Sequence, residues 1–124
     1  DIFARHLATI HVPRRYYTQL LPGIPTIRMF EALACGIPLV SAPWVDSEAL
    51  FRPGEDFLFA RDGAEMTRHL RALAADPKLR ASLVHSGLET VRSRHSCAHR
   101  AHELLDIVGA LRQDAGAASM EPAA

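Results

Sequence analysis

A helix that leads directly into an apolar strand, within residues 23–44, constrains the fold of this chain more than any other feature. The pattern predicts a helix that begins at Thr26, just after a proline, and ends at Gly36. The apolar run at residues 38–42 follows at once and lies between two prolines. A short run of this kind is typical of a strand that is buried on both faces of a parallel sheet.

Alternating strand and helix signals continue on both sides of this segment. Strands are predicted at residues 7–13 and 57–60, with a connection at 14–25, a helical turn and a half at 46–51, and a turn at 52–56. Three longer helices follow, opened by Asp62, Asp76 and Ser96. This order predicts an α/β fold, a Rossmann-like parallel sheet with flanking helices and right-handed crossovers.

The length and composition indicate one soluble globular domain. The chain has 124 residues, of which 48% are hydrophobic and 23% charged, enough to bury a single core. We expect residues 1–112 to form the domain, without its first strands, and residues 113–124 to form a disordered tail. The last helix is predicted to pack through an apolar face with i, i+3, i+4 spacing: Ala101, Leu104, Leu105, Val108 and Leu111.

Charge, cysteines and hydropathy exclude several classes of function. The formal net charge is zero, so no overall positive field exists to attract nucleic acid or acidic lipid. Cys35 and Cys97 are far apart and form no CxxC pair, which predicts neither a disulfide framework nor a thiolate metal site. No segment resembles a membrane span or a signal peptide. We expect a cytoplasmic protein, with the inner membrane surface as an alternative location.

The candidate ligand site lies where parallel strands end and a helix begins, since ligands of such sheets bind beside helix N-termini. Two regions meet this description, residues 11–15 and 23–31. The first turn of the helix, Thr26 to Arg28, offers free N–H groups and a partial positive charge of about half a unit. Ile27, Arg28 and Glu31 share one side of the helix. The spacing can place phosphate on the first turn and a ribose on the Glu31 carboxylate.

Other interpretations of these residues remain open from the sequence. Arg28 and Glu31 can instead form an i, i+3 ion pair on a solvated face. Arg14 and Arg15 follow the first strand and either reach a phosphate or cover the surface. His11 lies either near the ligand or in the core or its rim.

Two further groups of residues contain possible metal-binding or sugar-binding side chains, but simpler structural roles also explain them. The group His95, Cys97, His99 and His102 contains zinc ligands, but only His99 and His102 share a helical face, so capping and packing are favoured. Asp46 and Glu48 lie beside Trp44, where they can contact a sugar or open a short helix. We expect no metal site in this chain.

The stretch "TIRMFEALACGIPLVSAP" resembles the nucleotide-sugar-binding segment of GT-B glycosyltransferases. It is most similar to the CgeB-like group, in which "RxFEALACGxPL" is followed by "PGxD" and by an "H-S/T-x-x-H-R" stretch. This chain has "RMFEALACGIPL", then "PGED" at 53–56 and "HSCAHR" at 95–100. The resemblance covers about residues 1–112 in the same order.

The resemblance implies the C-terminal, donor-binding half of a metal-independent, bacterial GT-B glycosyltransferase. Glu31 then matches the carboxylate that holds the ribose hydroxyls, and Thr26, Ile27 and Arg28 match the positions that reach the diphosphate. Arg28 and Glu31 are the candidate catalytic residues. Gly23 stands where many retaining members carry a glutamate, which leaves the sugar contacts and the stereochemistry open.

The partners implied are a nucleotide diphosphate sugar as donor substrate and an N-terminal acceptor-binding domain that this chain does not contain. No cofactor is implied. We expect the fragment alone to be inactive, and a second copy can pair with its open sheet edge. The alternative is a non-catalytic Rossmann-like nucleotide-binding or interaction module, and an epimerase or phosphorylase of the same architecture is a third class.

Overall fold

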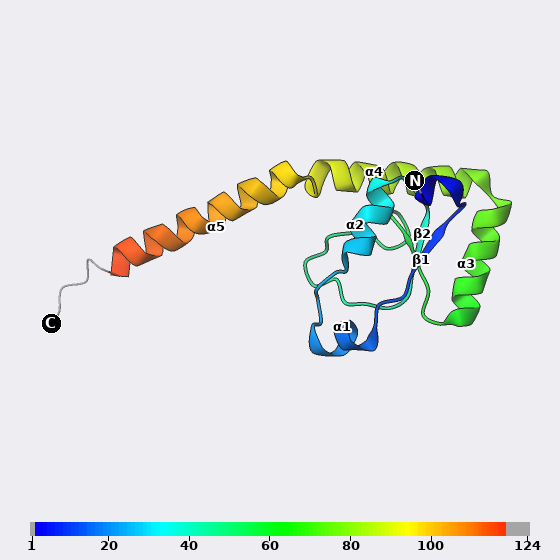
Figure 1. Ribbon diagram of the computed structural model, residues 1–124, viewed down its shortest axis with the longest axis horizontal. Helices are drawn as coiled ribbons and strands as arrows, with labels where there is room; N and C mark the ends of the chain where they lie inside the picture. Colours follow the sequence, from blue (N-terminus) through cyan, green and yellow to red (C-terminus); the bar gives the residue numbers. More distant parts are fainter. Residues whose placement is uncertain (1, 119–124) are drawn as a thin grey trace. The chain divides into compact units, whose positions relative to one another are not determined.

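The computed structural model describes residues 2–118, with side chains described except at residues 4, 17 and 114–118 (Figure 1). The chain divides into two compact units, residues 1–93 and residues from 94 onward. In chain order the elements are η1 (Phe3–Arg5), β1 (Thr9–His11), α1 (Arg15–Leu20), α2 (Ile27–Ala34), β2 (Leu39–Ser41), β3 (Leu58–Phe59), α3 (Gly63–Ala75), α4 (Pro77–Arg94) and α5 (Cys97–Ala118).

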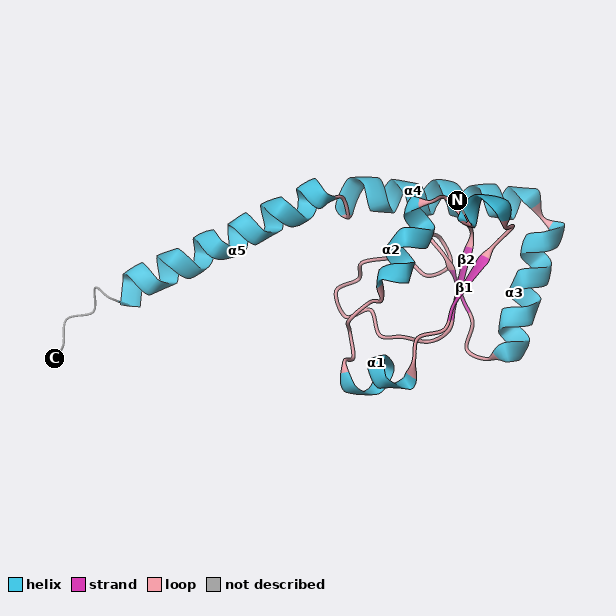
Figure 2. Ribbon diagram, in the orientation of Figure 1, coloured by secondary structure: helices cyan, strands magenta, loops and turns pink. Residues whose placement is uncertain are grey.

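The first unit is an α/β domain built on a parallel sheet. Its three strands lie in the order β1-β2-β3, with Thr9 paired to Leu39 and Val40 paired to Leu58. Helix α2 contacts β1 and β2, while α3 contacts β2 from the other side (Figure 2). This arrangement confirms the Rossmann-like fold class that the sequence predicts.

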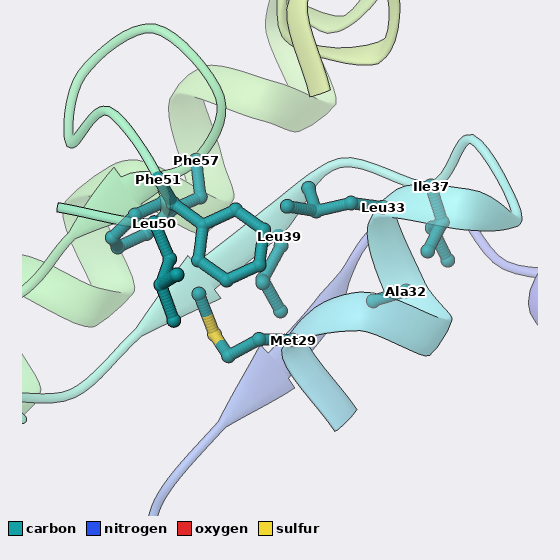
Figure 3. Packing of buried hydrophobic residues seen from close by; sticks show 8 residues of the cluster. All are labelled: Met29, Ala32, Leu33, Ile37, Leu39, Leu50, Phe51 and Phe57. Atoms are coloured by element: carbon teal, nitrogen blue, oxygen red, sulfur yellow. The ribbon is translucent and has the colours of Figure 1, made fainter. Parts of the chain in front are cut away.

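The central strand β2 anchors a hydrophobic core on each face of the sheet. Leu39 packs in a cluster with Met29 and Leu33 of α2 and with Phe57 (Figure 3). The next residue, Val40, packs instead with residues of α3 and α4. Successive side chains of a strand point to opposite faces, so a strand between two helical layers needs apolar residues on both faces, which Leu39 and Val40 supply.

The predicted helix starts at Asp62 and Asp76 are confirmed. The Asp62 carboxylate accepts a hydrogen bond from the backbone N–H of Glu65 at 2.8 Å, at the start of α3. The Asp76 carboxylate accepts from the backbone N–H groups of Lys78 and Leu79, at 2.8 and 3.1 Å, at the start of α4. Both side chains satisfy amide groups that a helix start leaves without partners.

Two loop predictions are wrong. The segment at 46–51 forms a turn and no helix, because the Asp46 carboxylate accepts from the backbone N–H groups of Leu50 and Phe51, both at 3.0 Å, and Ala49 takes a positive φ of 50°. That conformation interrupts a right-handed helix. The predicted connection at 14–25 contains the short helix α1.

The second unit contains α5, which differs from its prediction in packing and in length. Leu104, Leu105 and Leu111 are between 60% and 67% exposed, so the described part of the second unit does not itself cover these side chains of the predicted packed face. The helix extends to Ala118, so residues 113–118 are helical where a disordered tail was predicted, and residues 119–124 lie outside the described part. Among the described helices, α5 included, none has both the length and the apolar character needed to cross a membrane.

Candidate functional site

An open hollow of about 430 Å³ lies beside the end of β1 and the start of α2. It therefore brings together the two regions that the sequence singled out. Its lining residues are Ile10, His11, Val12, Pro13, Arg14, Thr26, Ile27 and Arg28. Arg15, by contrast, is the first residue of α1 and is not part of this lining.

The amphipathic pattern of α2 decides which of its side chains face the ligand side. Met29, Ala32 and Leu33 are buried in the core, which leaves Arg28 and Glu31 exposed on the opposite side. Glu31 borders a neighbouring hollow of about 690 Å³, and Arg28 borders both hollows. No ion pair joins Arg28 to Glu31 in the part of the chain that the structure describes. The i, i+3 pair therefore does not account for these two charges.

A buried histidine links the ends of β1 and β2 to the start of α2. His11 is only 3% exposed, and its Nδ1 lies 2.9 Å from Ser41 Oγ at the end of β2. Its Nε2 lies 2.8 Å from the hydroxyl oxygen of Thr26, the residue that precedes α2. The sequence analysis left the place of His11 open and did not single out Ser41. The signal that could have found Ser41 is that β1 and β2 both end in a polar residue, and the register pairs these two residues.

Burial, and next to it the positive charge of Arg28, lower the pKa of His11 below its ordinary value of 6.5. Desolvation disfavours the charged form of an imidazole, and a nearby cation acts in the same direction. The ring is therefore neutral at pH 7. A neutral imidazole has one donor and one acceptor nitrogen, which matches two neighbouring hydroxyl groups.

Gly23 occupies its position for a steric and a conformational reason. Its φ is +87°, a value that L side chains rarely adopt, and an added Cβ would lie 2.4 Å from Ser47 Oγ. A side chain at this position would therefore strain the backbone and require the Ser47 hydroxyl to turn away. Glycine fits this loop where the pattern of many retaining glycosyltransferases has a glutamate.

In the loop after β2, the Asp46 carboxylate forms hydrogen bonds within the loop itself. Both carboxylate oxygens of Asp46 accept backbone N–H groups of the same loop, which favours a role in holding the turn over a sugar contact. Trp44, His11 and Gly23 also border a narrow pocket of about 10 Å³, roughly the space of one water molecule. This pocket is too small for a sugar ring.

The histidine and cysteine side chains near the start of α5 make contacts other than those of a shared ligand set. No group of three metal-ligating side chains comes together anywhere in the described residues. Ser96 Oγ lies 2.6 Å from His99 Nδ1, and Arg100 Nη2 lies 2.7 Å from His95 Nδ1. The backbone N–H of His99 donates to Ser96 Oγ at 3.4 Å, which supports the capping interpretation of this segment.

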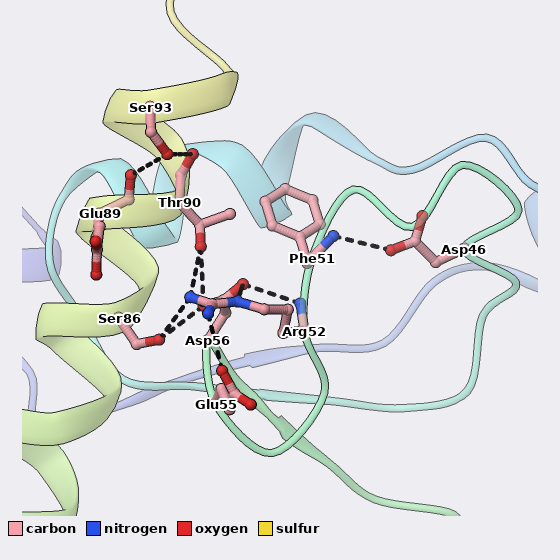
Figure 4. A network of polar contacts seen from close by, with 9 residues as sticks. All are labelled: Asp46, Phe51, Arg52, Glu55, Asp56, Ser86, Glu89, Thr90 and Ser93. Carbon is pink, nitrogen blue, oxygen red and sulfur yellow. Dashed lines mark hydrogen bonds and ion pairs between the residues drawn. The ribbon is translucent and has the colours of Figure 1, made fainter.

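The "PGED" motif forms a second polar cluster, which ties its turn to α4 (Figure 4). Asp56 is fully buried, and its Oδ1 accepts hydrogen bonds from Arg52, Ser86 and Thr90 at 2.9 to 3.0 Å. Its Oδ2 accepts from the backbone N–H of Arg52 at 2.9 Å. Burial alone would raise the pKa of this carboxyl group, but the hydrogen bonds from Arg52, Ser86 and Thr90 lower it overall.

Comparison with known proteins gives one finding. A family model described as glycosyl transferase-like matches residues 1–106. No curated protein and no solved structure gives a significant match.

Proposed function

Because this chain belongs to the glycosyl transferase-like family, which acts in glycosyl transfer, we propose that it is the donor-binding part of a GT-B enzyme of the CgeB-like group. The proposed donor is a nucleotide diphosphate sugar. The proposed reaction moves the sugar to an acceptor held by an N-terminal domain joined to this chain. The observation that carries the proposal is the hollow at the start of α2, which Arg28 borders without an ion-pair partner among the described residues.

Three groups on α2 divide the recognition of the donor between them. The first backbone N–H groups and the helix dipole bind the diphosphate, as helix N-termini bind anions in general. The Arg28 guanidinium adds a full positive charge beside them. Glu31 lies one turn further along the same side, where its carboxylate accepts hydrogen bonds from the ribose hydroxyls.

Catalysis in this scheme consists of orientation and charge stabilisation. When the bond between the sugar and the diphosphate breaks, negative charge develops on the leaving phosphate. Preorganised N–H groups and Arg28 stabilise this charge more strongly in the transition state than in the bound substrate. The scheme uses no metal ion. The acceptor and any general base belong to the N-terminal domain.

The test is a calorimetric titration of the chain, and of the full-length protein, with UDP, GDP, ADP and dTDP. We expect one nucleotide to bind selectively, and Glu31→Ala to weaken its binding about tenfold, because hydrogen bonds to a charged group are lost. Glu103→Ala, which removes an exposed carboxylate from α5, is the matched control and should bind as the parent does.

The outcomes separate the candidate functions. Absence of nucleotide binding by the full-length protein would contradict the transferase and leave a non-catalytic interaction module. Unchanged binding and activity in Glu31→Ala would favour a binding module that does not use this carboxylate. Product analysis with a labelled nucleotide sugar distinguishes a transferase from an epimerase or phosphorylase of the same architecture.

A further inference from the structure

We infer that His11 is a positioning residue for the donor site: it holds the Thr26 hydroxyl away from α2 and thereby keeps the first N–H groups of the helix open for the diphosphate. This inference rests on the proposed function. Its basis is the chain of hydrogen bonds that runs from Ser41 through the His11 ring to Thr26.

The direction of each hydrogen bond follows from the last partner in the chain. The Ser41 hydroxyl donates to the backbone carbonyl of Ala42 at 2.9 Å, so its oxygen is left to accept. It therefore accepts from His11 Nδ1–H. With the single proton of the neutral ring on Nδ1, Nε2 is an acceptor, and the Thr26 hydroxyl donates its hydrogen to it.

Thr26 is in the position from which a threonine normally caps a helix. Its φ of −81° and ψ of 152° are those of an N-cap residue, and a capping hydroxyl accepts from a backbone N–H two or three residues later. The Thr26 side chain makes no such hydrogen bond. Because the hydroxyl is directed to His11 instead, it does not compete with a ligand for the start of the helix.

The amide groups of the first turn are consequently available. The backbone N–H of Met29 bonds to the Thr26 carbonyl at 3.2 Å. Those of Ile27 and Arg28 have no hydrogen-bond partner in the described part of the chain, and both residues line the hollow. An anion seated there would receive two amide donors that an ordinary threonine cap would partly occupy.

The arrangement requires a neutral ring, since a protonated Nε2 could not accept from Thr26. The charged side chains that line the hollow are Arg14, after β1, and Arg28, on α2. Neutral Ser41 and Thr26 are the polar partners from β2 and from the start of α2. These surroundings disfavour a second positive charge on His11.

The experiment compares two variants of the full-length protein. In His11→Asn the amide group lies near the former Nδ1 and keeps the Ser41 contact, but no acceptor reaches Thr26, which becomes free to cap α2. We expect its affinity for the nucleoside diphosphate to fall about tenfold, the loss of roughly one hydrogen bond to a charged group. Affinity for the matching nucleoside, which lacks phosphate, should not change. His11→Gln, whose amide oxygen reaches the former Nε2, should keep the parent affinity.

The decisive variant adds Thr26→Val to His11→Asn. Valine has the same shape as threonine but cannot cap, so the double variant should recover diphosphate affinity. If the double variant binds no better than His11→Asn, with similar midpoints of thermal unfolding, the inference is wrong and His11 is only structural. Thr26→Val alone separates one further possibility: a tenfold loss of diphosphate affinity in this variant would mean that the Thr26 hydroxyl itself contacts the ligand, and it would overturn the inference.

The proposed function and this inference fail in different ways. Absence of nucleotide binding by the parent overturns the donor site, and the role of His11 with it. Binding that is sensitive to Glu31→Ala but unchanged in His11→Asn retains the donor site and overturns the role of His11. If His11→Asn does not fold, unaltered diphosphate binding in His11→Leu/Thr26→Val supports the inference, and its loss contradicts it.

Discussion

The two polar clusters of the first unit use their charges in opposite ways. In the "PGED" turn, the buried Asp56 carboxylate is surrounded by donors from Arg52, Ser86 and Thr90. On α2, the exposed side chains of Arg28 and Glu31 form no ion pair with each other or with another described residue. The Asp56 carboxylate has its hydrogen-bond partners within the protein, whereas the charged groups of Arg28 and Glu31 are available to bind a ligand.

The difference shows how to separate stability from function in a small α/β domain. A buried charge must be fully paired, because an unpaired one destabilises the fold by several kcal/mol. An exposed charge without a partner contributes little to stability and is available for a ligand. Substitutions in the two clusters should therefore change different measured quantities, and four predictions test this.

The largest expected effect is on the "PGED" turn. Asp56→Ala removes the acceptor of five hydrogen-bond donor atoms and leaves Arg52 without its buried partner, so we expect a loss of about 3 kcal/mol in the free energy of unfolding. Denaturant titration measures it. Glu31→Ala is the control and should stay within about 0.5 kcal/mol of the parent. Equal losses in the free energy of unfolding of both variants would contradict the proposed difference between the two clusters.

The next effect concerns the close approach of α4 to the same turn. A Cβ on Gly87 would lie 2.9 Å from Leu33 Cδ2 and 3.3 Å from the Asp56 carbonyl oxygen. Gly87→Ala should therefore destabilise the protein by about 1 to 2 kcal/mol, since overpacking outweighs the gain in helix propensity. Gly109→Ala, in α5, has open space around its Cβ and should be neutral or stabilising. A stabilising Gly87→Ala would contradict the tight packing described above.

A smaller effect is expected on α2, and it should appear in binding alone. Arg28→Gln removes the positive charge at the hollow, so we expect about a fivefold loss in affinity for the selected nucleoside diphosphate, roughly 1 kcal/mol. Its affinity should also depend less on salt, because one screened charge pair is gone. Arg92→Gln, an exposed arginine on α4, is the control. A loss of stability without a loss of affinity would place Arg28 with the structural cluster.

Local signals in the sequence predicted the parts of this fold that local interactions decide. The strand at residues 38–42, the caps Asp62 and Asp76, and the helix after Thr26 each follow from a few neighbouring residues. The exposed side of α2 followed in the same way, since three- and four-residue spacing separates Arg28 and Glu31 from the buried Met29. The candidate site was predictable to that extent.

The remaining features depend on contacts between distant residues. The bond between His11 and Ser41 joins positions 30 apart and exists only because the register of β1 and β2 pairs their last residues. Asp46 was predicted to start a helix because an aspartate carboxylate accepts hydrogen bonds from nearby backbone N–H groups both at a helix start and in an irregular loop. The apolar stripe of α5 predicted a packed face, but periodicity does not specify what covers it.

The smallest expected effect is the pH dependence that His11 adds to stability. Its pKa is lowered in the folded protein, mainly by burial and further by Arg28, while the unfolded chain titrates near 6.5. As the pH falls below 6.5, the unfolded state binds a proton before the folded state does, so stability is lost until the pH reaches the lowered folded value. His11→Gln does not titrate and should show a shallower fall in the unfolding midpoint between pH 7 and pH 5. An equal slope in both proteins would mean that the His11 ring takes up its proton as easily in the folded protein as in the unfolded chain. The neutral Nε2 that accepts from the Thr26 hydroxyl would then be lost between pH 7 and pH 5.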